Sequence, residues 1–247
     1  MKSDCPITAR GRIVEVDVKH AGRIGPRHLQ RKPDSALWKR MSMIKRARAA
    51  IYDAAIVGMT GTWYRAVLDR LPPRCRLLDI GIGTGSALLA NAALVVAKDL
   101  NVTGVDVDGA YVDRCNRGVA QRGLDDRIAA RRESIYDHRD GPYDAAYFSA
   151  SFMLLPDPPA ALRHVRSLLM PGARLYFTQT FEHERSRAVE VLKPLLRVVT
   201  TIDFGRVTYE HDFRRALASG GVEIEAFEIL HGGRRRSAVL AVAHPAE

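Results

Sequence analysis

The stretch from Leu77 to Gly85 reads Leu-Leu-Asp-Ile-Gly-Ile-Gly-Thr-Gly. An apolar segment that ends in an acid, Asp79, runs directly into three glycines at alternate positions, 81, 83 and 85. Glycines at such positions let backbone N–H groups approach a polar ligand closely at the start of a helix. A second apolar stretch ends in Asp106, where a carboxylate can accept hydrogen bonds from two ribose hydroxyls. Together the two segments predict a site for a nucleoside-bearing cofactor.

Details of the glycine loop distinguish between cofactors. The dinucleotide fingerprint Gly-x-Gly-x-x-Gly would need glycine at position 86, which is Ser86. Asp79 precedes the first glycine, where it would repel a pyrophosphate but suits a cationic amino group. In these features the chain resembles the class I S-adenosylmethionine-dependent methyltransferases, whose first motif is acid-x-Gly-x-Gly-x-Gly. The resemblance covers roughly residues 50–247 and implies S-adenosyl-L-methionine as cofactor; an NAD-dependent Rossmann enzyme is the alternative.

The order of expected elements predicts an α/β fold. Strands and helices alternate after residue 75, which is typical of a parallel sheet. We expect strands at 76–80, 102–106, 128–133, 143–149 and 174–180. We expect helices at 84–98, 108–122, 158–169, 184–198 and 209–219. The chain closes with strands at 222–230 and 237–244 around Gly232-Gly233, a hairpin. This ending resembles the family's doubly wound, seven-stranded, three-layer α/β/α sheet, in which the last strand is antiparallel.

The basic residues are concentrated at the N-terminus. Residues 1–50 contain thirteen Lys and Arg against four acids, which is +9 of the total charge of +10. We therefore predict a basic N-terminal arm at 1–34 that binds RNA or another polyanion, or is simply a solvated Arg-rich leader. Two N-terminal lid helices are expected within 35–72: one over 35–57, ended by Gly58 and Gly61, and one over 62–71. The Rossmann-like core would then span 73–247.

Composition narrows the remaining possibilities. No apolar run reaches the roughly 18 to 20 residues that a bilayer span needs. Cys5, Cys75 and Cys115 show no metal-ligand spacing, and the first residues lack the apolar segment of a signal peptide. We expect a cytoplasmic protein without a bound metal, and the sequence does not indicate an oligomeric state.

The resemblance also implies which residues contact the cofactor. Asp79 and the three glycines would surround its methionine part, near the start of helix 84–98, with Tyr52 or Tyr64 donating to its carboxylate. The ribose role falls to Asp106, whereas Asp108 suits a helix cap. The remaining predicted cofactor-binding positions are Val107 after the second strand of the core, Ser134 and Ile135 after the third strand, where they would contact the adenine, and Ser149 at the end of the fourth.

The methyl acceptor is less well specified. The segment after Ser149 lacks the (Asp/Asn)-Pro-Pro-(Tyr/Phe/Trp) and Pro-Cys motifs of base methyltransferases, and Asp157-Pro158-Pro159 is expected to start a helix. Transfer to an oxygen, nitrogen or carbon of a small molecule is therefore favoured. RNA or protein methylation through the basic arm and a non-catalytic cofactor-binding module are the alternatives. A general base would assist a neutral nucleophile, and the candidate catalytic and positioning residues are His138, His183, His211, Tyr147 and Tyr209.

Overall fold

The computed structural model describes residues 58–182, 208–233 and 235–246. The chain divides into two compact units, Met1–Ala47 and Arg48–Glu247, and every described residue belongs to the second. The predicted arm at 1–34, the first lid helix, helix 184–198, Tyr52 and His183 all lie outside the described residues.

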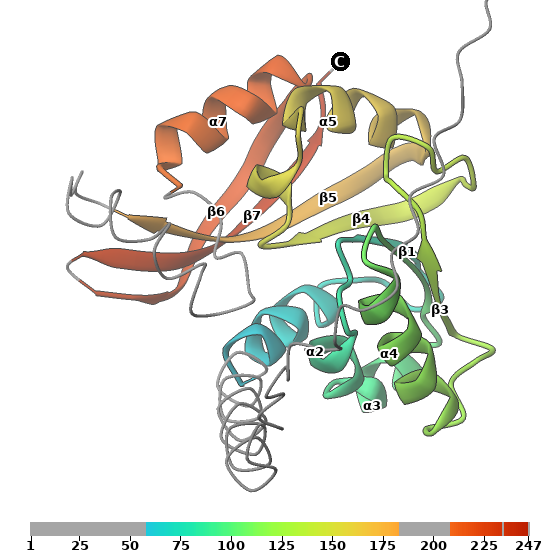
Figure 1. The fold of residues 1–247 in the computed structure, drawn as a ribbon. Coiled ribbons are helices and arrows are strands. Elements are labelled where there is room, and N and C mark those ends of the chain that lie inside the picture. Colours follow the sequence, from blue (N-terminus) through green and yellow to red (C-terminus); the bar gives the residue numbers. More distant parts are fainter. Residues whose placement is uncertain (1–57, 183–207, 234, 247) are drawn as a thin grey trace, which may run out of the picture. The chain divides into compact units, whose positions relative to one another are not determined.

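One seven-stranded sheet forms the centre of the second unit (Figure 1). Its strands are β1 (Arg76–Ile80), β2 (Asn101–Asp106), β3 (Ile128–Arg132), β4 (Tyr143–Ser149), β5 (Leu169–Glu182), β6 (Val222–Gly232) and β7 (Arg236–Pro245). Their order is β3-β2-β1-β4-β5-β7-β6, and β7 is antiparallel to both of its neighbours. The predicted fold class, including the antiparallel insertion of the last strand, is confirmed.

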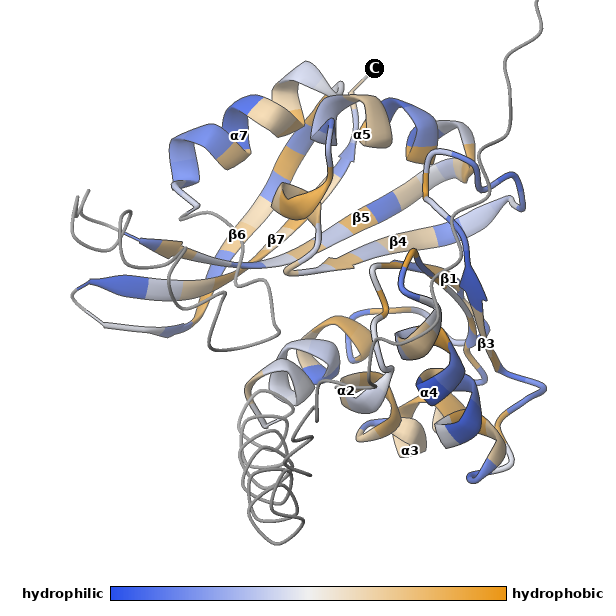
Figure 2. Cartoon of the chain, viewed as in Figure 1, coloured by the Kyte–Doolittle hydropathy of each residue, from blue (hydrophilic) through white to orange (hydrophobic). Residues whose placement is uncertain are grey.

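Helices cover both faces of the sheet. The helix whose described part is residues 58–68, together with α2 (Ser86–Leu89), α3 (Ala92–Ala97) and α4 (Gly109–Ala120), contributes to one buried apolar cluster. The short helix η1 (Phe152–Leu154), α5 (Pro158–Ser167) and α7 (Glu210–Ser219) contribute to the cluster on the other face. Figure 2 shows hydrophobic residues along the strands, and hydrophilic residues on α4 and α7. None of the helices in the described ranges is long and apolar enough to cross a membrane.

The helix predicted at 84–98 is in fact two short helices, α2 and α3, separated at Ala90 and Asn91. The Asn91 amide donates hydrogen bonds to the carbonyls of Ala87 and Gly61, both at 2.9 Å. Asparagine side chains compete with helical backbone hydrogen bonds in this way. The break thus links the first turns after the glycine loop to the helix at 58–68.

The glycines at 58 and 61 do not end a helix, contrary to the prediction, because residues 58–68 are helical throughout. Each glycine in a helix costs up to about 1 kcal/mol relative to alanine. Burial of the side chains of Trp63, Tyr64, Val67 and Leu68 outweighs that cost, since each large apolar side chain contributes about 1.5 to 3 kcal/mol.

Candidate active site

The predicted cofactor residues meet at the carboxyl edge of the parallel strands. Ile80 of β1 pairs with Val105 of β2 and with Phe148 of β4, so these three strands end side by side. The loops that follow them carry the three glycines, Val107 and the segment after Ser149. In an open α/β sheet this edge is where ligands bind.

At two of the three glycines of the loop, a side chain would collide with a neighbouring residue. Gly81, Gly83 and Gly85 all have positive φ, at 78°, 59° and 65°. A Cβ at Gly81 would lie 2.6 Å from Cβ of Ser151, and one at Gly85 would lie 2.3 Å from Sγ of Cys115. A Cβ at Gly83 would meet nothing within 4 Å. Gly83 is therefore the point at which the loop backbone is open to a ligand.

Asp79 is fully buried below this loop. Its Oδ2 accepts a hydrogen bond of 2.8 Å from the Tyr64 hydroxyl, whereas Oδ1 is buried without a hydrogen-bond partner. Burial raises the pKa of Asp79 to about 7; the Tyr64 hydrogen bond opposes that rise and the nearby Asp106 charge adds to it. An unpartnered carboxylate oxygen is costly, and a cationic group would satisfy it. The residues present therefore fit the amino group of S-adenosylmethionine.

Tyr64 is used differently from the sequence-based expectation. Its single hydroxyl proton goes to Asp79 and not to a cofactor carboxylate. The cause is its burial on the inner face of the helix at 58–68, where burial and the Asp79 charge raise the pKa of the phenol well above its usual value.

Asp106 is positioned by the backbone on both sides of it. Its Oδ2 accepts from the N–H of Gly83 and its Oδ1 from the N–H of Asp108, each at 2.9 Å. Each oxygen retains a further lone pair, which suits two ribose hydroxyls. Asp108 caps α4 by accepting from the N–H groups of Ala110 and Tyr111, which confirms its predicted role. Val107 between the two acids is 69% exposed and offers an apolar surface.

The segment after β3 lies next to Asp106, because the Glu133 N–H donates to the Asp106 carbonyl at 3.1 Å. Ser134 is partly buried, and its hydroxyl accepts from the Tyr136 N–H at 3.3 Å. The Ile135 side chain is buried in the cluster that also contains Ile80. It therefore faces the core and not an adenine ring, because it is buried among residues of the sheet.

The N-terminus of the first helix after the glycine loop contributes less to ligand binding than the sequence predicts. Helix α2 has four residues, and its N-cap, Gly85, provides no side-chain cap. The dipole of so short a helix contributes little at its N-terminus. The Gly83 N–H already donates to Asp106, so Gly83 offers a ligand close approach to the backbone and not a free donor.

Three predicted polar residues for catalysis have structural or exposed positions. His138 is fully buried; Nδ1 lies 2.7 Å from Glu133 Oε1, and Nε2 lies 2.8 Å from the Tyr143 hydroxyl. It fastens the connection from β3 to β4 and is not free to act as a base, so that expectation is wrong. His211 is 50% exposed, with Nε2 3.0 Å from Asp212 Oδ1. Tyr147 belongs to the core, where its hydroxyl lies 2.8 Å from the hydroxyl of Thr178.

Tyr209 and a residue that the sequence reasoning missed lie near the end of β5. The Glu182 N–H donates to the Thr208 carbonyl at 3.1 Å, which holds the start of α7 beside this strand end. Gln179 donates from Nε2 to the Thr208 hydroxyl at 3.3 Å, while its Oε1 is buried without a partner. The signal in the sequence was a glutamine between two threonines at the end of an apolar run. Ser149 ends β4 opposite Thr178 and is partly buried.

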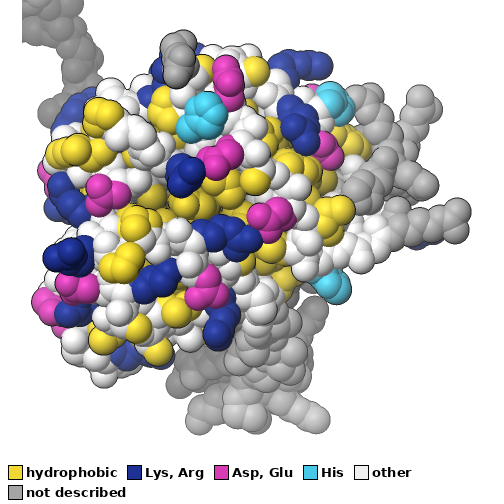
Figure 3. Space-filling model, turned by 180° about the vertical axis from the view of Figure 1, so that it is seen from behind, with side chains coloured by type: hydrophobic (Ala, Val, Ile, Leu, Met, Phe, Trp, Pro, Cys, Tyr) yellow, Lys and Arg dark blue, Asp and Glu magenta, His cyan; other side chains and the backbone are white. Residues whose placement is uncertain are grey.

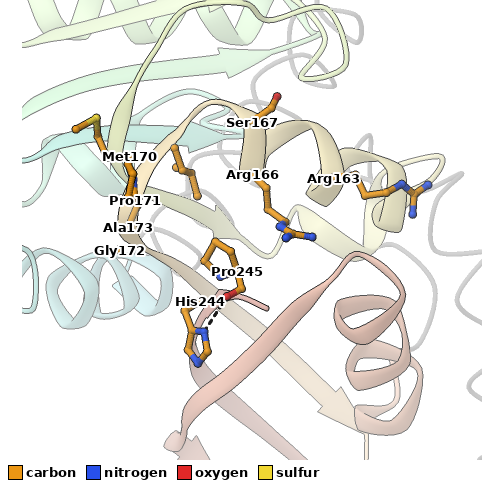
Figure 4. A pocket seen from close by; sticks show the side chains of 10 residues that line it. Arg163, Arg166, Ser167, Met170, Pro171, Gly172, Ala173, His244 and Pro245 are labelled. Atoms are coloured by element: carbon orange, nitrogen blue, oxygen red, sulfur yellow. Dashed lines mark hydrogen bonds between the residues drawn. The ribbon is translucent and has the colours of Figure 1, made fainter. Parts of the chain in front are cut away.

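A separate pocket of about 680 Å³ lies at the amino end of β5, the opposite edge of the sheet (Figure 4). Arg163, Arg166 and His244 line it among apolar residues. Arg166 donates to the carbonyls of Gly220 and Ala246, and His244 lies 3.0 Å from the carbonyl of Pro245. These side chains satisfy backbone carbonyls, so the pocket is structural.

Basic and acidic side chains are interspersed on the face seen from behind in Figure 3. This agrees with the sequence after residue 50, which has 25 basic and 24 acidic residues. The described residues on the face shown therefore offer no concentrated basic surface to a polyanion.

Comparison with known proteins identifies the family. The family described as "Methyltransferase domain" matches residues 48–226. The 27-O-demethylrifamycin SV methyltransferase of Amycolatopsis mediterranei (strain S699) is 26% identical over 163 residues, which cover 62% of this chain and 56% of that protein. The chain spans 56% to 63% of the length of the first curated relatives that it matches.

Two solved structures share the fold. The geranyl diphosphate C-methyltransferase from Streptomyces coelicolor A3(2), in complex with Mg²⁺, geranyl diphosphate and S-adenosyl-L-homocysteine, has a TM-score of 0.61 at 16% identity, covering 76% of this chain and 77% of that one. The [4+2]-cyclase SpnF has a TM-score of 0.60 at 20% identity, covering 75% and 81%. At these identities the likeness shows the fold alone. The family match, the glycine loop and the sheet order agree, and the chain belongs to the class I S-adenosylmethionine-dependent methyltransferases.

Proposed function

We propose that the protein transfers a methyl group from S-adenosylmethionine to an oxygen, nitrogen or carbon of a small molecule. The observation that carries this proposal is the unpartnered Oδ1 of Asp79 below a loop that is open at Gly83. The ammonium group of the cofactor would pair with Asp79, directly or through one water. When bound, the cofactor supplies a methyl group activated on a sulfonium sulfur.

The other cofactor contacts follow from the loops at the same edge. We assign the ribose hydroxyls to Asp106, since two backbone N–H groups already fix its carboxylate. Val107 and Ser134 would flank the adenine, and Gly81 and Gly85 shape the loop around the methionine part. Tyr52 stays a candidate for the cofactor carboxylate.

We place the methyl acceptor next to the segments that follow the carboxyl ends of β4 and β5. Methyl transfer needs chiefly a nucleophile held in line with the methyl group in a dry site. The apolar helix η1 follows Ser151, and its Leu154 is 53% exposed. Gln179 and Tyr209 supply polar groups near the end of β5, and Tyr209, His183 and His211 remain the candidate bases. An apolar wall with few polar groups suits a small molecule, and the 27-O-demethylrifamycin SV methyltransferase is named for such a substrate.

A second candidate function is methylation of RNA or protein, favoured by the charge of residues 1–50. We infer that the arm at 1–34 is a unit separate from the lid helices at 35–72 and the core at 73–247. A cofactor-binding protein that transfers no methyl group is the third possibility, because one neighbour in fold is named as a cyclase.

A radiolabelled-methyl screen over small-molecule, RNA and protein pools tests these proposals. We expect label in a small-molecule product, and label in RNA or protein alone would favour the second candidate. Calorimetry on the same protein separates the cofactors. S-adenosylmethionine binding without label in any pool would favour a non-catalytic role, and NAD binding without S-adenosylmethionine binding would contradict the proposal.

A further inference from the structure

Tyr64 determines which oxygen of Asp79 is free. Its hydroxyl donates to Oδ2 at 2.8 Å, and both residues are buried. Oδ1 is equally inaccessible to solvent and has no partner. The Tyr64 hydroxyl thus satisfies one oxygen of the Asp79 carboxylate and leaves Oδ1 without a hydrogen bond.

The groups that face Asp79 come from four elements. They are Tyr64 of the helix at 58–68, Asp106 of β2, Cys115 of α4 and Tyr147 of β4. No cation is among these four described neighbours. Burial and the Asp106 charge both raise the pKa of Asp79, and the Tyr64 hydrogen bond is the influence that lowers it. Tyr64 is thus the group that favours the ionised carboxylate.

The Tyr64 ring is held in place by the rest of the fold. It meets the Tyr147 ring edge-on, with ring centroids 4.9 Å apart. The Asn91 amide donates to the Gly61 carbonyl, and Lys98 Nζ donates to the carbonyls of Leu68 and Leu71 at 2.9 and 2.8 Å. These contacts attach the described helix to the core near both of its ends. They keep the Tyr64 hydroxyl directed at Asp79.

We propose that Tyr64 is a positioning residue of the cofactor site, which favours the ionised form of Asp79 and leaves Oδ1 for the cofactor's ammonium group. Packing of the helix at 58–68 against the core then influences whether Asp79 is ionised. This inference rests on the proposed function, because it requires a ligand that carries an ammonium group. Where Asp79 is protonated in the free protein, binding of that group releases the proton to solvent.

The test is calorimetry between pH 5.5 and 8 with two ligands: S-adenosylhomocysteine, which carries the ammonium group, and methylthioadenosine, which lacks it. For the wild-type protein we expect the affinity for S-adenosylhomocysteine to fall as the pH falls through about 7. Titrations at pH 7 in buffers of different ionisation enthalpy should show about half a proton released, as expected for a group at its pKa. Methylthioadenosine should release none.

Tyr64→Phe is the decisive variant, with Tyr147→Phe as its matched control. Both remove a buried hydroxyl from the same pair of rings, but only Tyr64 contacts Asp79. In Tyr64→Phe the midpoint of the pH dependence should rise by about one unit, which weakens S-adenosylhomocysteine binding about fivefold at pH 7 and much less at pH 8. In Tyr147→Phe the midpoint should not move.

The outcomes separate the two proposals. An unchanged midpoint in Tyr64→Phe, or an equal loss of affinity at every pH, would overturn the positioning role while leaving the proposed function intact. Failure of the wild-type protein to bind S-adenosylhomocysteine would overturn the proposed function itself. If Tyr64→Phe does not fold, the wild-type protein still decides, because a pH-independent affinity for S-adenosylhomocysteine, or no proton release at pH 7, would refute the inference.

Discussion

The backbone N–H of Gly83 donates a hydrogen bond of 2.9 Å to Oδ2 of Asp106, joining the loop after β1 to the end of β2. Gly83 and Asp106 are 23 residues apart in the sequence, yet they meet at the edge of the sheet where we propose that the cofactor binds. The contact holds the carboxylate in place before any ligand arrives, so less ordering is required on binding.

Replacing Asp106 should weaken cofactor binding far more than replacing its neighbour Asp108. Asp106→Ala removes the acceptor for two ribose hydroxyls, and we expect S-adenosylhomocysteine affinity to fall by about 10-fold to 100-fold, at about 1 kcal/mol or more for each hydrogen bond lost. Asp108→Ala removes the cap of α4 and should cost about 1 kcal/mol of stability with little change in affinity. Equal affinities in calorimetry would contradict the ribose assignment.

The glycines at 83 and 81 should respond differently to alanine. Both have positive φ, which costs about 1 to 2 kcal/mol for a residue with a Cβ. At Gly81 the new Cβ also collides with Ser151, so the melting temperature should fall more in Gly81→Ala than in Gly83→Ala. Gly83→Ala places a methyl group in the open part of the loop and should lose cofactor affinity in a folded protein. Full affinity in that variant would show that the ligand does not approach Gly83.

Asp79 should limit stability at neutral and alkaline pH. Its pKa rises from 3.8 to about 7 on folding, so the folded state favours the protonated form. The cost of ionising it is absent below about pH 4, grows as the pH rises, and is complete above about 7, at up to about 4 kcal/mol. Asp79→Asn should therefore stabilise the protein against urea at pH 8 but not at pH 4, while cofactor affinity is lost. A pH-independent change in the free energy of unfolding would contradict this.

His138 should matter for stability and not for chemistry. His138→Leu leaves Glu133 and the Tyr143 hydroxyl without their partner, and we expect a loss of about 2 to 4 kcal/mol in the free energy of unfolding. His231→Leu, at an exposed position of β6, serves as the control and should stay within about 0.5 kcal/mol. Urea unfolding measures both, and a His138 variant as stable as the control would refute the structural role.

Gln179 should affect the acceptor and not the cofactor. Gln179→Met keeps the length of the side chain but removes the unpartnered Oε1 and the bond to Thr208. We expect kcat/KM for the acceptor to fall about 10-fold, the loss of one positioning hydrogen bond, with S-adenosylmethionine affinity unchanged. A normal kcat/KM in this variant would show that Gln179 does not position the acceptor.

Local sequence determined the cofactor loop and most of the sheet. Glycines at 81, 83 and 85 are needed because each has positive φ, and strands β1 and β4 begin and end at the predicted residues, because apolar runs bounded by turn residues are local signals. Asp108 likewise caps the helix that directly follows it.

Tertiary structure decided which hydrogen-bond partner each of these polar side chains has. The Tyr64 proton goes to Asp79, His138 lies between Glu133 and Tyr143, and Asn91 reaches Gly61 across the break between α2 and α3. Ile135 turns inward and packs in the cluster that also contains Ile80 and Val105. Such partners depend on which elements pack together and on the need to satisfy every buried polar group, which no window of sequence contains. The amino-acid sequence by itself thus indicated the cofactor, and long-range packing decided which atoms are left to bind it.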